Sequence, residues 1–152
     1  LFCNVGPKSV IEALDAKTIY DVPLLMLKEK LDTRVLKKMK LKSGGTPEMV
    51  AWKEFLGRLK NPTHEVNIGL IGKYNDLPDA YKSIYEAFVH SGAHNECTVN
   101  VLPIHSDKLD SKEVKEKLEG LNGVLVAPGF GERGVLGKLA SVKFVREQNI
   151  PF

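Results

Sequence analysis

The chain has 152 residues, 43% of them hydrophobic, which is enough for a domain with a buried core. A formal net charge of +3 is too small to indicate a nucleic-acid-binding protein, and the apolar runs are far shorter than a membrane span. The two cysteines, Cys3 and Cys97, have no metal-binding or redox spacing, so we interpret them as buried thiols of a reducing compartment.

Charge is distributed unevenly along the chain. Residues 1–62 hold 12 Lys and Arg against 7 Asp and Glu, whereas residues 63–152 hold 10 against 12. This asymmetry suggests two pieces with different roles.

The first piece is predicted to contain short helices. Residues 8–14 are expected to form a brief helix. Pro23 suits the first turn of another, because its missing N–H costs nothing there. A third is expected to start at a cap formed by Asp32 or Thr33.

A break at residues 43–47 precedes an amphipathic helix. Thr46 is a suitable N-cap and Pro47 a suitable first helical residue. The helix is expected to stop at Asn61–Pro62 and to act as a connector, and we interpret Trp52 as a packing residue rather than a ligand-binding one. Its apolar face consists of Met49, Trp52, Phe55, Leu56 and Leu59.

From Glu65 onward, strand patterns alternate with helix patterns. Short apolar runs, typical of strands buried on both faces, alternate with segments whose apolar residues recur at helical spacing. Gly92 is expected to cap the first helix, and the spacing of Leu136, Leu139, Val142 and Val145 predicts the last one. The alternation predicts right-handed crossovers and a parallel sheet, the front half of a doubly wound α/β domain. The expected strands cover residues 66–71, 98–104 and 123–127.

The best candidate site is the loop at residues 128–134, between the third strand and the last helix. Its glycines, at positions 129, 131 and 134, allow a tight turn that brings backbone N–H groups close to a ligand. They match the dinucleotide-binding pattern Gly-x-Gly-x-x-Gly, but that motif belongs after the first strand, with an acidic residue about 20 positions further on. A dinucleotide site, and a loop that is glycine-rich only for geometry, both stay open as alternatives.

The residues at the strand ends bear on two further alternatives. Gly72–Lys73 resembles a phosphate-binding loop, but the first glycine of that motif is absent and Tyr74 replaces its Ser or Thr. A receiver-like binding module would need clustered carboxylates after its first and third strands, where this chain has Gly72–Lys73 and Pro128–Gly129. We therefore expect neither, while a non-catalytic nucleotide-binding module stays an alternative.

Five sequence blocks are spread over nearly the whole chain. They are Leu1–Val5 (LFCNV), Asp15–Pro23 (DAKTIYDVP), Ile71–Tyr74 (IGKY), Leu77–Ser83 (LPDAYKS) and Pro128–Gly134 (PGFGERG). Together, and in this order, they resemble the CTP synthase family, although no single block would carry the resemblance.

The resemblance implies a domain order. Residues 1–42 would be the C-terminal tail of a Rossmann-like, P-loop-type synthetase domain, and residues 43–65 an interdomain linker helix. Residues 66–152 would be the N-terminal part of a class I glutamine amidotransferase domain with a flavodoxin-like, doubly wound parallel sheet. Both ends of the chain are expected to lie inside a longer protein.

The resemblance also implies a reaction. In this family, a synthetase domain uses ATP with Mg²⁺ to phosphorylate UTP and adds ammonia to form CTP. An amidotransferase domain supplies the ammonia from glutamine, and GTP activates the enzyme. The implied parent is a cytoplasmic homotetramer without nucleic-acid or membrane partners, whose Mg²⁺ ligands lie outside this chain. Since the catalytic cysteine is expected beyond Phe152, the chain alone should be inactive.

The site residues in the first piece are carried over from the family by position. Asp15 and Ala16 match contacts of the ATP adenine, and Phe2 matches a residue near the pyrimidine of UTP or CTP. From the residues alone, Asp15 could equally cap a turn, and an aromatic residue such as Phe2 is more often part of a core.

In the second piece, Gly129 matches the glycine whose backbone faces the glutamine and its oxyanion. Phe130 and Arg133 match the pair that holds GTP by ring stacking and guanidinium contacts. Most family members have a second glycine before the phenylalanine, where this chain has Pro128, which has no N–H to donate.

Two lysines of the second piece also have counterparts. Lys73 and Lys82 match lysines of the domain junction in the family. From the residues alone, both are equally explained as exposed, solvated amines.

Overall fold

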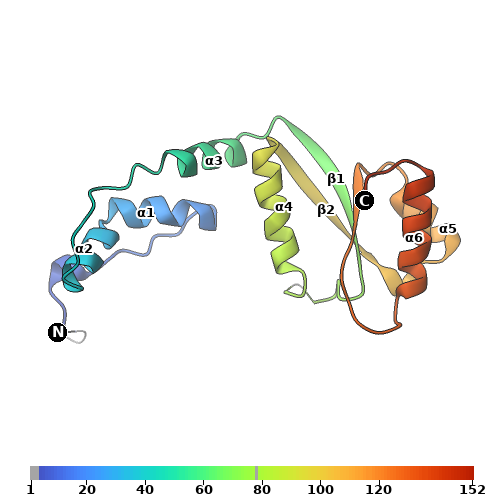
Figure 1. Ribbon diagram of the computed structural model, residues 1–152, viewed down its shortest axis with the longest axis horizontal. Coiled ribbons are helices and arrows are strands. Elements are labelled where there is room, and N and C mark those ends of the chain that lie inside the picture. Colours follow the sequence, from blue (N-terminus) through green and yellow to red (C-terminus); the bar gives the residue numbers. More distant parts are fainter. Residues whose placement is uncertain (1–3, 78) are drawn as a thin grey trace. The chain divides into compact units, whose positions relative to one another are not determined.

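The computed structural model describes residues 4–77 and 79–152. The chain forms two compact units, of which the first ends at Leu56 and the second begins at Gly57, so the boundary falls inside helix α3 (Val50–Lys60). Figure 1 shows short helices in the first unit and helices beside strands in the second. Among the described residues, no helix has the length and apolar character that a membrane crossing requires.

The described residues of the second unit contain a three-stranded parallel sheet in the order β2-β1-β3. Helices α4 and α5 join successive strands and α6 follows the last, so the predicted alternation and the parallel sheet are confirmed. The strands are β1 (His64–Gly72), β2 (Cys97–His105) and β3 (Gly123–Val126). The helices are α4 (Lys82–His94), the 3-10 turn η3 (Ser106–Lys108), α5 (Ser111–Leu118) and α6 (Val135–Glu147).

Helices cover both faces of this sheet. Leu70 and Ile71 are neighbours in β1 and point to opposite faces, yet both are fully buried. Ile71 belongs to a core with Leu118 of α5 and Val145 of α6, whereas Leu70 belongs to a second cluster that includes Tyr85 of α4. Burial on both faces explains why the strands are recognisable as apolar runs.

The predicted role of Gly92 as a C-cap is wrong. Helix α4 continues to His94, and Gly92 is buried inside it. A Cβ at this position would lie 2.7 Å from the carbonyl oxygen of Cys97 at the start of β2. Glycine is therefore needed for the close approach of α4 to the strand, and the chain turns instead at Glu96, whose φ is 55°.

Helix α6 buries only part of the apolar face predicted for it. Leu136 and Leu139 are 82% and 61% exposed, whereas Gly137 and Val145 are buried. A Cβ at Gly137 would collide with the carbonyl oxygen of Ser106, so only glycine lets α6 lie this close to η3. Close backbone approach at Gly137 and the apolar side chain of Val145 together set the buried face of α6.

The first unit contains short helices, as predicted, but one cap differs. Pro23 lies in the first turn of α1, in agreement with the prediction. Lys30, and not Asp32 or Thr33, precedes α2, and its φ of 57° places it in the left-handed region without a side-chain cap. The chain changes direction at Lys30, because only two residues separate α1 from α2. The elements are the 3-10 turns η1 (Pro7–Ser9) and η2 (Ile19–Asp21), followed by α1 (Val22–Lys28) and α2 (Leu31–Lys38).

Two other predicted boundaries in this unit are wrong. Residues 8–14 contain only the end of η1, because Val10 is extended and its carbonyl oxygen accepts a hydrogen bond from Nη1 of Arg34 at 3.1 Å. Helix α3 begins at Val50 and not at Pro47, since Met49 has a φ of 53°, which a right-handed helix does not accommodate.

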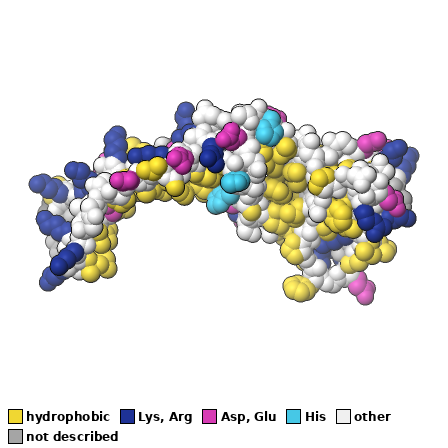
Figure 2. Space-filling view, turned by 45° about the horizontal axis from the view of Figure 1, so that its top comes forward, with side chains coloured by type: hydrophobic (Ala, Val, Ile, Leu, Met, Phe, Trp, Pro, Cys, Tyr) yellow, Lys and Arg dark blue, Asp and Glu magenta, His cyan; other side chains and the backbone are white. Residues whose placement is uncertain are grey.

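The packing interpretation of Trp52 is confirmed. Its indole N–H donates to the carbonyl oxygen of Tyr20 at 2.9 Å, and its ring centroid lies 6.2 Å from that of Tyr20 and 5.5 Å from that of Phe55. Elsewhere in this unit, large apolar side chains such as Val10 and Ile19 are exposed. Figure 2 shows apolar side chains on the molecular surface, interspersed with Lys and Arg.

Candidate functional site

The carboxyl ends of β1 and β3 lie side by side where the strand order of the sheet reverses. The chain passes from β1 to β2 on one side and then to β3 on the other, which makes this position a topological switch point. Residues 73–77 and 79–81, the described part of one loop, follow β1, and the loop of residues 127–134 follows β3. Open α/β sheets bind their ligands at such positions, so these two loops form the candidate site.

The loop after β3, here called the glycine loop (residues 127–134), is held by backbone and lysine contacts. The N–H of Ala127 donates to the carbonyl oxygen of Ile71 at 2.9 Å and extends the ladder with β1. Nζ of Lys138 donates to the carbonyl oxygen of Ala127 at 2.7 Å, and Nζ of Lys73 donates to that of Phe130. Two ammonium groups therefore give this loop a positive potential.

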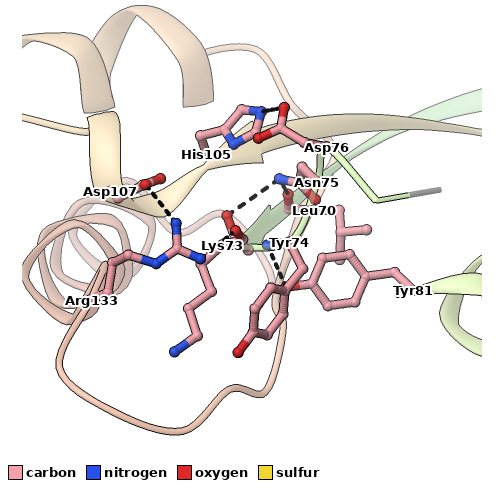
Figure 3. Close-up of polar contacts among 10 residues, drawn as sticks. Leu70, Lys73, Tyr74, Asn75, Asp76, Tyr81, His105, Asp107 and Arg133 are labelled. Atoms are coloured by element: carbon pink, nitrogen blue, oxygen red, sulfur yellow. Dashed lines mark hydrogen bonds and ion pairs between the residues drawn. The ribbon is translucent and has the colours of Figure 1, made fainter. Parts of the chain in front are cut away.

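Lys73 and Arg133 connect the two loops (Figure 3). Nη2 of Arg133 donates to the carbonyl oxygen of Lys73 at 3.0 Å, and Nη1 pairs with Oδ2 of Asp107 at 3.0 Å. The centroid of the Tyr74 ring lies 5.3 Å from Nζ of Lys73 and 5.8 Å from Cζ of Arg133, which is within cation–π range. Basic groups and an aromatic face thus meet at the switch point.

The glycines of this loop are needed for two different reasons. Gly131 and Gly134 have φ values of 82° and 79°, a left-handed conformation that favours glycine. Gly129 lies outside that region, but a Cβ at this position would lie 2.9 Å from Cε of Lys73. Gly129 therefore makes room for a lysine side chain, and a positive φ is not the reason for its presence.

The loop after β1 is ordered by contacts with its own strand and with β2. Nδ2 of Asn75 donates to two backbone carbonyl oxygens near the end of β1, at 3.4 Å each. The N–H of Tyr74 donates to the hydroxyl oxygen of Tyr81 at 3.4 Å, and Oδ1 of Asp76 lies 3.4 Å from Nε2 of His105. Figure 3 shows Asp76 beside His105, and the ring of Tyr74 between Lys73 and Tyr81.

The profile of the family described as Glutamine amidotransferase class-I matches residues 76–152, slightly more than half of the chain. The chain belongs to this family. The matched range includes β2, β3 and the glycine loop, so the loop lies within an amidotransferase domain.

Several curated relatives match this chain along its whole length, and these are CTP synthases. It is 62% identical to the CTP synthase of Cytophaga hutchinsonii and 58% identical to that of Flavobacterium psychrophilum, in each case over all 152 residues. The chain spans only 28% of the length of these relatives. It is also similar to a solved structure of the Trypanosoma brucei CTPS glutaminase domain with bound acivicin, with 36% identity and a TM-score of 0.53. That match covers 57% of this chain and 34% of the solved one.

Four of the predicted site residues lie together at the switch point. Lys73, Gly129 and Phe130 are in direct proximity, and Arg133 is bonded to the carbonyl oxygen of Lys73. The side chain of Phe130 is 98% exposed, whereas Lys73 is only 6% exposed and is not a solvated surface amine.

The other predicted residues lie elsewhere. Lys82 is exposed on α4 and pairs with Glu86 at 3.1 Å. Asp15 and Ala16 lie in the first unit, in the segment before η2, and the cap of η2 is Thr18 and not Asp15. Phe2 lies outside the described residues.

Sequence reasoning missed three residues that hold the site together. Tyr74 follows a strand that ends at the switch point, so the strand order would have drawn attention to it. Asp107 and Lys138 had no comparable signal, because an acid after a strand and a lysine in a helix are common. Their roles depend on contacts between segments more than ten residues apart.

The alternative binding modules are not favoured. Within the described residues, no group of three or more His, Cys, Asp or Glu side chains could hold a metal ion. The ends of β1 and β3 carry Lys73 and Pro128–Gly129 in place of the carboxylates of a receiver. The glycine loop follows β3 and not the first strand, and the family match favours an amidotransferase over a dinucleotide-binding domain.

Proposed function

We propose that this chain is an internal part of a glutamine-dependent CTP synthase. The observation that carries the proposal is the glycine loop at the switch point of an amidotransferase domain. All 152 residues of the chain align with a CTP synthase at 62% identity. The whole protein would convert UTP to CTP with ATP, using ammonia released from glutamine. The chain would span the end of the synthetase domain, the linker and the start of the amidotransferase domain.

In this proposal the glycine loop binds the oxyanion of glutamine hydrolysis. The tetrahedral intermediate carries a negative oxygen that needs fixed hydrogen-bond donors. Since Pro128 has no N–H, the donor from this loop is the amide of Gly129. The ammonium groups of Lys73 and Lys138 add a favourable positive potential. The nucleophilic cysteine would come from the part of the domain that follows this chain.

We also propose that the outer side of this loop binds the activator GTP. The exposed ring of Phe130 is free to stack on a purine base, and Arg133 supplies a guanidinium group nearby. Because Arg133 is paired with Asp107, GTP would have to exchange this ion pair for contacts of its own.

The remaining assignments are proposals by analogy with the CTP synthases. Asp15 and Ala16 would contact the ATP adenine, for which the exposed carboxylate of Asp15 is suitable, and Phe2 would lie near the pyrimidine. Lys73 and Lys82 would lie at the domain junction. The parent would be a cytoplasmic homotetramer, with Mg²⁺ held by residues outside this chain.

Two substitutions at one position test the oxyanion role in the full-length enzyme. Gly129→Ala adds a Cβ but keeps the N–H, whereas Gly129→Pro adds a Cβ and removes the N–H. We expect Gly129→Pro to lower glutamine-dependent CTP formation about 100-fold below Gly129→Ala, since one lost oxyanion donor costs about that much. Ammonia-dependent CTP formation should be the same in both variants.

Melting curves of both variants provide the folding control. Equal glutamine-dependent rates in the two folded variants would rule out Gly129 as the donor. A parent enzyme that forms no CTP from UTP, ATP and ammonia would contradict the proposed function as a whole.

A further inference from the structure

A lysine lies almost fully buried between the two loops of the candidate site. Lys73 is 6% exposed, although burial of an ammonium group is unfavourable unless other contacts replace the lost water. Its Nζ donates to the carbonyl oxygen of Phe130 and lies 5.3 Å from the ring centroid of Tyr74. These two contacts hold the amine inside the protein, directly beside the proposed oxyanion loop.

Both the side chain and the backbone of Lys73 are hydrogen-bonded to the glycine loop. Its ammonium group binds the carbonyl oxygen of Phe130, and its own carbonyl oxygen accepts a hydrogen bond from Arg133 at 3.0 Å. Lys138 binds the carbonyl oxygen of Ala127 at 2.7 Å, at the start of the same loop. The backbone is therefore fixed on both sides of Gly129, which limits the directions in which the N–H of Gly129 can point.

The side chain of Lys73 also explains why position 129 is a glycine. A Cβ at Gly129 would lie 2.9 Å from Cε of Lys73, closer than ordinary van der Waals contact. Any larger residue would require the end of this lysine side chain to shift. The two positions are therefore coupled, although they lie 56 positions apart in the sequence.

We infer that Lys73 is a positioning residue, which holds the glycine loop in the conformation that directs the N–H of Gly129 toward the substrate. This inference rests on the proposed function, because the oxyanion role of the loop is part of it. Lys73 acts through the carbonyl oxygen of Phe130 and touches no reacting atom.

The first test is a spectroscopic one and uses the chain itself. Lys73→Met keeps an unbranched apolar side chain, one heavy atom shorter than lysine, but removes the donor. Lys143→Met is the matched control, because Lys143 is an exposed lysine of α6. We expect Lys73→Met to shift the backbone amide resonances of Phe130 and Gly131 and to leave those of β2 in place. The control should shift none of them, and unchanged resonances in folded Lys73→Met would overturn the inference.

The second test is a double-mutant cycle between positions 73 and 129, measured as the midpoint of thermal unfolding. We expect Gly129→Ala to lower the midpoint in the original chain, because its Cβ displaces the lysine. In a Lys73→Ala background the space is empty, so Gly129→Ala should lower the midpoint by much less. Additive effects would show that the two positions are not coupled and would overturn the inference.

The third test concerns the proposed reaction and uses the full-length enzyme. Lys73→Met should lower kcat for glutamine-dependent CTP formation about 10- to 100-fold, as expected for a misplaced catalytic group, while ammonia-dependent formation is unchanged. Shifted resonances with an unchanged glutamine-dependent rate would overturn the role in positioning the donor. If the unmodified enzyme hydrolyses no glutamine, the proposed function fails, whereas the first two tests still judge the contact between Lys73 and the loop.

Discussion

The two units of the chain use their apolar residues differently. In the second unit, Leu70, Ile71, Leu118 and Val145 are completely buried between the sheet and its helices. In the first unit, helices α1 and α2 are fully described and contain no buried residue. Because apolar burial drives folding, we expect the second unit to contribute most of the stability of the chain.

Helices α5 and α2, one from each unit, differ in how they begin. Helix α5 begins with a capping box, in which Oδ1 of Asp110 accepts the N–H groups of Lys112 and Glu113 at 2.8 and 2.9 Å. Helix α2 begins after Lys30, which is left-handed and makes no side-chain cap. Local capping and tertiary burial therefore support each other at α5, whereas α2 has neither a side-chain cap nor a buried residue.

The largest expected effect comes from removing buried leucine atoms. Leu118→Ala in the second unit should lower the free energy of unfolding by about 2–5 kcal/mol, because it leaves a cavity in the core. Leu14→Ala, at an exposed position of the first unit, should change it by no more than about 0.5 kcal/mol. Urea unfolding followed by far-UV circular dichroism measures both. Equal losses would show that the first unit has a core of similar strength.

An intermediate effect is expected from a pair of helical glycines. Gly137→Ala should destabilise the second unit by about 1–3 kcal/mol, because its Cβ collides with the backbone of η3. Gly57→Ala in α3 meets no atom within 4 Å and should stabilise the chain by roughly 0.5–1 kcal/mol through helix propensity. Thermal unfolding of the two variants gives opposite signs if the close contact at Gly137 is real.

The smallest expected effects concern the two helix starts. Asp110→Ala should lower the free energy of unfolding by about 1 kcal/mol, whereas Asp110→Ser keeps a capping oxygen and should lower it by less.

Lys30→Gly should stabilise α2 by up to about 1 kcal/mol, because glycine adopts the left-handed conformation without strain. Trp52, the single tryptophan, reports on the first unit by its fluorescence during urea unfolding. A loss of stability in Lys30→Gly would contradict the strain at this position.

The alternation of strands and helices in the second unit could be predicted from the sequence because its periodicity is local. Apolar runs such as the one in β3 are bounded by glycine and proline, and both signals act within a few residues. The glycine loop could be located for the same reason. In the first unit, by contrast, left-handed residues such as Lys30 and Met49 set the helix boundaries, and nothing in their residue type indicates that conformation.

The sequence by itself determined the fold class, the order of the elements and the position of the glycine loop, since these depend on short-range patterns. The tertiary structure alone decided that Leu136 faces outward while Gly137 is buried, and that Lys73 lies inside the protein against Gly129. These outcomes depend on how closely backbones approach where β1, β3 and α6 meet. Hydrophobic periodicity reports that a face is covered, but the atoms that cover it belong to segments far away in the chain.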